Sequence, residues 1–186
     1  MVLRCLAIVC LFAAPASALA TTIWSGPEIA FSKAAFADPT LEANQDRMTD
    51  SVSLTRATSQ GIYNAHSEVS YASTSPADTE WAWDLASFNT GLEIAAPNYE
   101  NLEFNLWATA HGFSPPSTVG IPGVLHLISE DIYIDITFTS WGQTPSSGGP
   151  FSYMRTTVPE PGAAILLTIG LCGLGVLRRN KSERRG

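Results

Sequence analysis

The chain has 186 residues, a formal net charge of −7 and three cysteines. The charges are segregated, since residues 21–158 contain fifteen acidic and four basic side chains, whereas residues 178–186 contain five basic ones. An acidic body of this kind excludes nucleic-acid binding, which needs a basic surface that releases counterions from phosphates. All three cysteines lie outside this body, which therefore has no disulfide, no thiol nucleophile and no cysteine-ligated zinc site.

The first twenty residues have the pattern of a secretory signal peptide. Arg4 supplies the positive n-region, and Leu6–Ala14 form an apolar h-region. Ala18 and Ala20 are the small residues of a cleavage sequence, and we expect cleavage after Ala20. The alternative is an uncleaved N-terminal anchor, but about ten apolar residues are too few for a bilayer that needs about 20.

Residues 21–157 alternate short apolar runs with turns rich in Gly, Pro, Ser and Asn, and they show no long helical pattern. Short strands at such spacing predict an all-β fold, and we expect a single antiparallel β-sandwich of jelly-roll type. A brief helical turn is expected near Pro39–Asn44, where Asp38 can act as its cap. The expected strands are Glu28–Lys33, Ser51–Ala57, Gly61–Tyr71, Glu80–Leu85, Leu102–Ala110, Val124–Ile128, Asp131–Trp141 and Phe151–Thr157.

The segment Asp131–Trp141 has the clearest strand pattern. Its large apolar residues recur at every second position, which places them on one face and the polar residues on the other. Asp131 and Asp135 share the polar face and lie about 13 Å apart, at about 3.3 Å per residue. That exceeds the separation of glycosidase carboxylate pairs, so a catalytic pair would need a bend or a third carboxylate. We interpret these two acids and Glu130 as residues of the polar face.

The body contains three histidines, His66, His111 and His126, and none of their spacings matches HxH or HExxH. A zinc site would therefore need all three to converge in the fold. The alternative is that they are surface residues or hydrogen-bonded strand residues.

Asp46 and Asp50 are the candidate calcium ligands, because hard cations bind several oxygen atoms. Their segment lacks the glycine and the ligand spacing of an EF-hand. The alternative is a polar turn in which Arg47 forms a salt bridge.

Trp81 and Trp83 lie on one face of an expected strand, and Trp107 lies in the next strand along the chain. If exposed, such rings could stack on sugars as a glycan platform, whereas buried rings belong to the core, where large aromatics usually lie. The body has no Gly-x-Ser-x-Gly elbow and no phosphate-binding glycine loop. We therefore expect a non-enzymatic ectodomain, with a carbohydrate-binding module or a polysaccharide hydrolase as the alternative.

The C-terminal segment, residues 158–186, has three parts in order. Pro159, Glu160 and Pro161 come first, and an uncharged apolar run of about 15 residues follows, about 22 Å long as a helix. A basic cluster that begins with Arg178 and Arg179 ends the chain and acts as a stop-transfer signal. We therefore expect one transmembrane helix at 162–177, the body outside the inner membrane, and residues 178–186 in the cytoplasm.

This order of Pro-Glu-Pro, short apolar helix and terminal arginine cluster resembles the PEP-CTERM sorting signal. The resemblance implies that exosortase, a membrane-embedded transpeptidase-like enzyme, recognises Pro159, Glu160 and Pro161 and cleaves near them. The two prolines keep the segment extended, where an active site can reach it. The alternative is a linker before a plain single-pass anchor.

The body resembles a domain of PEP-CTERM and other secreted bacterial proteins that has no established activity, through segments such as Thr22–Pro27, Thr79–Ala82 and Phe138–Gly142. Together, the resemblances imply a protein exported by a Gram-negative bacterium. It would be anchored transiently in the inner membrane with a periplasmic ectodomain, and then reside at the cell surface or in the exopolysaccharide matrix of a biofilm. Exosortase, the inner membrane and exopolysaccharide are its expected partners, and no cofactor is expected beyond the calcium considered above.

Overall fold

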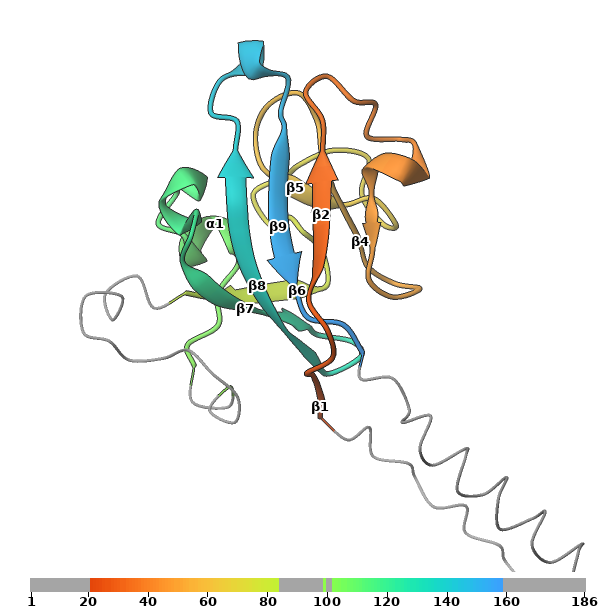
Figure 1. Ribbon diagram of the computed structural model, residues 1–186, viewed down its shortest axis with the longest axis vertical. Helices are drawn as coiled ribbons and strands as arrows, with labels where there is room; N and C mark the ends of the chain where they lie inside the picture. Colours follow the sequence, from red (N-terminus) through yellow and green to blue (C-terminus); the bar gives the residue numbers. More distant parts are fainter. Residues whose placement is uncertain (1–20, 84–98, 100–101, 159–186) are drawn as a thin grey trace, which may run out of the picture.

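The computed structural model describes residues 21–83, 99 and 102–158 (Figure 1). Most of the regular secondary structure in this part of the chain is β-strand, with a few short helical turns, which confirms the all-β expectation. The described strands form a six-stranded and a three-stranded sheet. Their bounds are β1 Thr22–Trp24, β2 Ile29–Lys33, β3 Asp46–Arg47, β4 Ser53–Arg56, β5 Ile62–Asn64, β6 Thr79–Ala82, β7 Pro122–Leu127, β8 Ile132–Trp141 and β9 Phe151–Arg155.

The long strand β8 organises the larger sheet, whose order is β2-β9-β8-β7-β6. One edge of β8 pairs antiparallel with β7, and its C-terminal half pairs antiparallel with β9. Its N-terminal half pairs with β1 in parallel, so that Thr22 lies opposite Ile132. β1 and β9 therefore follow one another along one edge of β8, which brings the two ends of the domain together.

The period of two in β8 corresponds to two different environments. Ile134, Ile136 and Phe138 are at most 1% exposed and belong to the core, as the alternation predicted. The polar face is also partly covered, because Tyr99 stacks on Tyr133 with ring centroids 5.8 Å apart. From Tyr133 to Phe138, the strand is therefore buried on its apolar face and half-buried on the other.

The three-stranded sheet, ordered β3-β4-β5, packs its apolar residues into the same hydrophobic cluster as the larger sheet. Val52, Leu54 and Ile62 are fully buried in that cluster, together with Trp24 from β1 and Trp81 from β6. Packing of both sheets on one core explains how a domain without disulfides is stabilised, since apolar burial is the main favourable term in folding.

Several strand predictions were wrong in extent or type. Residues 102–110 do not form a strand, because Trp107–Ala110 is a single helical turn, α1. β5 ends at Asn64, well short of Tyr71, since the Asn64 carbonyl accepts hydrogen bonds that close a turn. β1 and β3 were not among the predicted strands, and the parallel pairing of β1 departs from a purely antiparallel sheet.

The helical turn near Pro39–Asn44 is present as a 3-10 turn, η1, at Glu42–Asn44. The Asp38 carboxylate accepts hydrogen bonds from the backbone and the hydroxyl of Thr40, so it caps the turn that precedes η1 rather than η1 itself.

The expected export and sorting segments lie outside the described residues. These are the signal peptide at 1–20 with Ala18 and Ala20, the motif at 159–161, the expected span at 162–177, and the tail with Arg178 and Arg179. In the part of the chain that the structure describes, no helix has the length and apolarity needed to cross a membrane.

Candidate functional site

A pocket of about 430 Å³ lies where the C-terminal end of β8 meets α1 and the β4–β5 turn. Trp141 at this end of β8 pairs with Phe151, whereas Ile132 at the other end pairs with Thr22. Ten strand residues separate the two ends by about 30 Å. The pocket therefore lies far from the end of the domain where the chain enters and leaves. Its lining includes Arg56, Gln60, Gly61, Tyr71, Trp107, His111, Phe113, Pro115, Pro116 and Trp141.

A group of aromatic rings forms one part of the pocket wall. Trp107 on α1 contacts Trp141 with ring centroids 5.4 Å apart and Tyr71 with centroids 6.1 Å apart. Trp107 is buried, whereas Tyr71 and Trp141 are half-buried. Gly61 permits this packing, because a Cβ at that position would lie 2.5 Å from the Trp107 ring and would also meet Tyr71.

His111 closes the inner side of the pocket and is 2% exposed. Its ring lies against Trp107 with centroids 4.1 Å apart, because the two residues are four apart on one helical turn. Among the described residues, no other residue forms a hydrogen bond with either ring nitrogen of His111 or with Nε1 of Trp107. Burial lowers the pKa of His111 to about 4, so the ring is neutral at pH 7.

Arg56 brings a positive charge to the pocket and is 3% exposed. Its Nε donates a hydrogen bond to the Gln60 carbonyl at 2.8 Å, and its Nη1 donates to the Pro150 carbonyl at 3.2 Å. The guanidinium lies 3.8 Å from the centre of the Trp141 ring, in cation–π geometry. None of the carboxylates in the described residues forms an ion pair with it.

The positive charge of Arg56 is therefore buried at the pocket without a carboxylate partner among the described residues. Burial lowers the pKa of Arg56 to about 10. Lys33 lies outside the pocket lining and is 1% exposed, and its Nζ also has no hydrogen-bond partner within the described part of the chain. Its pKa is lowered by burial and by the charge of Arg56, although Asp38 acts in the opposite direction. The pocket lining contains no Asp or Glu among the described residues.

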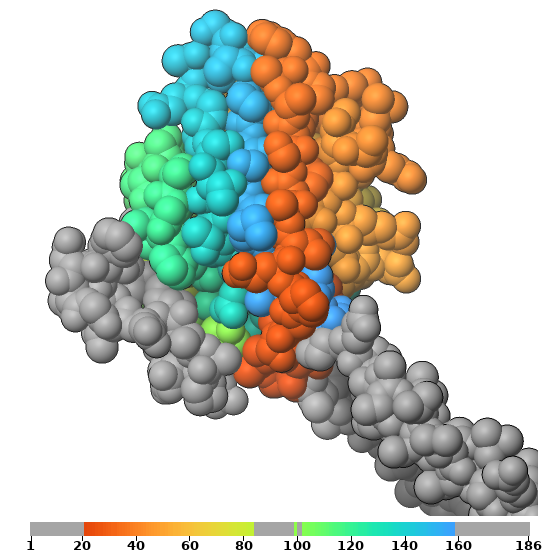
Figure 2. All heavy atoms as spheres, viewed as in Figure 1, coloured from red at the N-terminus to blue at the C-terminus, as the bar shows by residue number. Residues whose placement is uncertain are grey.

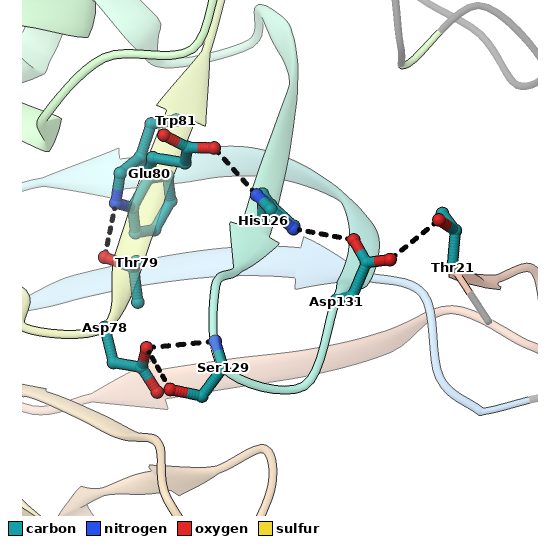
Figure 3. Close-up of polar contacts among 8 residues, drawn as sticks. All are labelled: Thr21, Asp78, Thr79, Glu80, Trp81, His126, Ser129 and Asp131. Atoms are coloured by element: carbon teal, nitrogen blue, oxygen red, sulfur yellow. Dashed lines mark hydrogen bonds and ion pairs between the residues drawn. The ribbon is translucent and has the colours of Figure 1, made fainter. Parts of the chain in front are cut away.

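A separate polar network lies near the N-terminal end of β8 (Figure 3). Nδ1 of His126 lies 2.7 Å from Glu80 Oε1, and its Nε2 lies 3.2 Å from Asp131 Oδ1. The hydroxyl of Thr21 donates to the second oxygen of Asp131 at 2.7 Å. This chain of contacts links β6, β7, the turn before β8 and the start of β1, so it holds the N-terminal end of the domain on the sheet.

The three histidines do not converge. His126 is 8% exposed, hydrogen-bonded and stacked on Tyr133, which matches the hydrogen-bonded strand interpretation. His66 is exposed, and His111 lies at the aromatic pocket. Over residues 21–83, 99 and 102–158, no three His, Cys, Asp or Glu side chains gather as metal ligands.

The exposed glycan platform of Trp81, Trp83 and Trp107 is not present. Trp81, Trp83 and Trp107 are 0%, 9% and 2% exposed, because all three pack in the hydrophobic cluster. The core alternative is therefore correct for these residues. Trp81 and Trp83 stack on each other with centroids 5.3 Å apart.

The carboxylates near β8 are occupied individually and do not face one another as a pair. Asp135 accepts a hydrogen bond from the Tyr99 hydroxyl at 2.6 Å, and burial raises its pKa. Glu130 accepts a hydrogen bond from Thr49 at 2.8 Å. Asp131 lies in the turn before β8 with a φ of 52°, outside the strand that was expected to include it.

The two calcium candidates also have other partners. Asp46 is 7% exposed and binds Arg155 through both of its oxygens, at 2.6 and 2.8 Å. It also accepts a hydrogen bond from the Tyr153 hydroxyl at 2.7 Å. Asp50 forms the exposed salt bridge with Arg47 that the polar-turn alternative expected, at 2.6 Å.

Two residues of the pocket, Trp107 and His111, were candidates in the sequence, although Trp107 was expected in a strand. His111 was considered as a zinc ligand or as a surface or hydrogen-bonded strand residue, and Arg56 and Trp141 were not predicted as site residues. The spacing of four between Trp107 and His111, followed by Gly112, is a helical signal that could have located the pocket wall. No protein-family model, curated protein or solved structure matches the chain significantly.

Proposed function

We propose that the protein is an exported cell-surface or extracellular-matrix protein whose ectodomain is anchored by its C-terminal segment and then sorted by exosortase. In this proposal the two sheets on their shared core form a small β-sandwich ectodomain. The ectodomain has no enzymatic role, and its sorting motif is the substrate of the processing enzyme.

The supporting observation is that both ends of the described domain leave it on the same side. The Gly26 N–H donates to the Thr157 carbonyl at 3.0 Å, and the Thr157 hydroxyl donates to the Pro27 carbonyl at 2.9 Å. Figure 2 places the first described residues, in red, beside the last ones, in blue, at the lower end of the molecule. A domain with this geometry can be tethered at one end while the aromatic pocket faces away from the membrane.

The junction with the sorting motif is short, which matters for processing. β9 ends at Arg155, and the motif begins four residues later at Pro159. An extended chain of that length reaches about 13 Å at most. The folded domain would therefore lie close to the membrane-embedded enzyme while the motif is being recognised.

The test compares the intact mass and location of the protein in cells with and without exosortase. We expect the mature chain to begin at Thr21 and to end near Pro159–Pro161 only when the enzyme is present. The double variant Pro159→Ala, Glu160→Ala should keep the tail through Gly186 in the inner membrane. The matched control, Asn180→Ala with Ser182→Ala, alters the tail outside the motif and its basic residues, and it should be processed normally.

The proposal fails if the tail persists in the inner membrane whether or not the enzyme is present. The protein would then be a plain single-pass anchored domain. The hydrolase alternative has no support from the pocket, since the described lining offers no carboxylate pair.

A further inference from the structure

The aromatic pocket combines three features that a merely structural cavity does not need. Among the described residues, it has a buried guanidinium with no carboxylate partner, a buried histidine with no partner for its ring nitrogens, and an exposed aromatic ring at its rim. Buried polar groups are normally paired. A guanidinium without a counter-charge beside an open pocket is therefore a group that an anionic ligand would satisfy.

The rim residue is Phe113, which is 79% exposed and has a φ of 60°. A bulky residue rarely adopts this left-handed conformation, and an exposed phenylalanine gains little from burial. Phe113 follows Gly112, which also has a positive φ, and the turn that the two residues form holds the Phe113 ring at the pocket mouth. Such a ring offers an apolar face to a ligand that enters between it and the wall.

The charge of the pocket is opposite to that of the domain. Residues 21–158 carry a large excess of acidic side chains, yet the described lining has one cation and no acid. The guanidinium of Arg56 has five N–H donors, of which two make the hydrogen bonds to carbonyls described above. The remaining donors suit a carboxylate, which arginine binds through paired hydrogen bonds.

Flat aromatic faces beside polar groups suit one class of anionic ligand in particular. The half-buried rings of Tyr71 and Trp141 can stack on the C–H face of a pyranose ring, while polar edges bind its hydroxyls. Gln60 and Gln143 are exposed polar residues of the lining and can bind such hydroxyls. A carboxylate on the same ring would reach Arg56.

We propose that this pocket binds a carboxylate-bearing sugar, as found in an acidic polysaccharide. The inference is independent of sorting, because it rests only on Arg56, Phe113 and the half-buried rings of Tyr71 and Trp141. The pocket is at the end of β8 opposite the chain ends, so it stays accessible when the domain is tethered.

The test titrates the purified full chain in detergent with tetragalacturonate and follows tryptophan fluorescence, since Trp107 and Trp141 line the pocket. The fully methyl-esterified tetramer serves as the neutral counterpart. We expect saturable binding of the acid, with an affinity at least tenfold higher than that of the ester, because a charged hydrogen bond to Arg56 is lost. Acetate at the same carboxylate concentration should not compete.

The chain offers a matched pair of variants for this test. Phe113→Gly should weaken binding of the acid at least fivefold and leave the urea midpoint unchanged or higher, because glycine adopts a positive φ without strain. Phe36→Gly is the control, since Phe36 has a φ of 59° and is 65% exposed but does not line the pocket. It should relieve the same strain and leave binding unaltered.

Each contrary outcome overturns the proposal. Absence of saturable binding to the acid removes the site, and equal affinity for the ester removes the role of Arg56. Competition by acetate would mean that only a charge is recognised, not a sugar. Equal loss of binding in Phe113→Gly and Phe36→Gly would show that the pocket rim has no part in recognition.

Discussion

The substitution Asp46→Asn tests the strongest buried contact between the two sheets. Asp46 lies on β3 of the smaller sheet, whereas Arg155 and Tyr153 lie on β9 of the larger one. All three residues are at most 7% exposed, and the two Arg155–Asp46 hydrogen bonds form a paired, charge-assisted contact. Burial and the nearby Asp46 charge raise the pKa of Tyr153, so its hydroxyl remains a proton donor to this carboxylate.

Asparagine at position 46 would keep the shape but leave the Arg155 charge buried without a counter-charge. Removal of one partner from a buried ion pair costs about 3–5 kcal/mol. A small domain has a free energy of unfolding of about 5–15 kcal/mol, so the loss would be a large fraction of the total. Urea unfolding followed by tryptophan fluorescence should show a lower midpoint with an unchanged slope.

Asp50→Asn is the matched control, because Asp50 pairs with Arg47 through side chains that are 96% and 69% exposed. Exposed pairs contribute little, so its midpoint should match that of the unmodified chain. The double variant Asp46→Asn, Arg155→Met should recover part of the loss, since no unpaired charge remains buried. Equal midpoints for Asp46→Asn and Asp50→Asn would refute the reasoning. A stability gain on addition of Ca²⁺ that Asp46→Asn abolishes would instead indicate a metal-binding role.

Two further predictions concern the aromatic pocket. Burial holds the pKa of His111 in the folded state at about 4, below the usual 6.5. The stability that this neutral histidine contributes is therefore fully present above pH 6.5, and it is lost as the pH falls towards 4. The difference amounts to about 3 kcal/mol at most, and His111→Phe should flatten this part of the pH dependence of urea unfolding; an unaltered pH profile would contradict the assignment. Gly61→Ala should destabilise the domain by about 1–3 kcal/mol and change the tryptophan emission, because the added methyl group would overlap Trp107. An unchanged urea midpoint would show that the pocket wall rearranges to fit the methyl group without loss of stability.

Strand character was largely readable from the sequence where one face of a strand is buried. The alternation from Ile132 to Phe138 predicted β8, because successive side chains of a strand point to opposite faces and only one face entered the core. The same logic explains the failure at Leu102–Ala110. Trp107 and Ala108 are buried there on one helical turn, and an apolar pair alone does not distinguish a turn from a strand.

The charged residues show the limit of local patterns most clearly. In the sequence, Asp46 and Asp50 were equivalent candidates for calcium ligands, because they are two carboxylates in one short polar segment. In the fold Asp46 is buried against a residue 109 positions away, whereas Asp50 stays at the surface beside Arg47. A long-range partner of this kind leaves no periodic signal, because it depends on how two sheets pack.

By itself, the sequence determined the all-β class, the main apolar stripe, the acidic and cysteine-free body, and the motifs on which the sorting proposal rests. These follow from composition and short periods, which act over a few residues. Only the tertiary structure decided that the three tryptophans are core, that β1 joins β8 in parallel, and that both ends of the domain meet. It also decided that Arg56, Trp107 and Trp141, which are far apart in the sequence, form one pocket. Bringing distant residues together costs chain entropy, and only burial of the complete core compensates that cost.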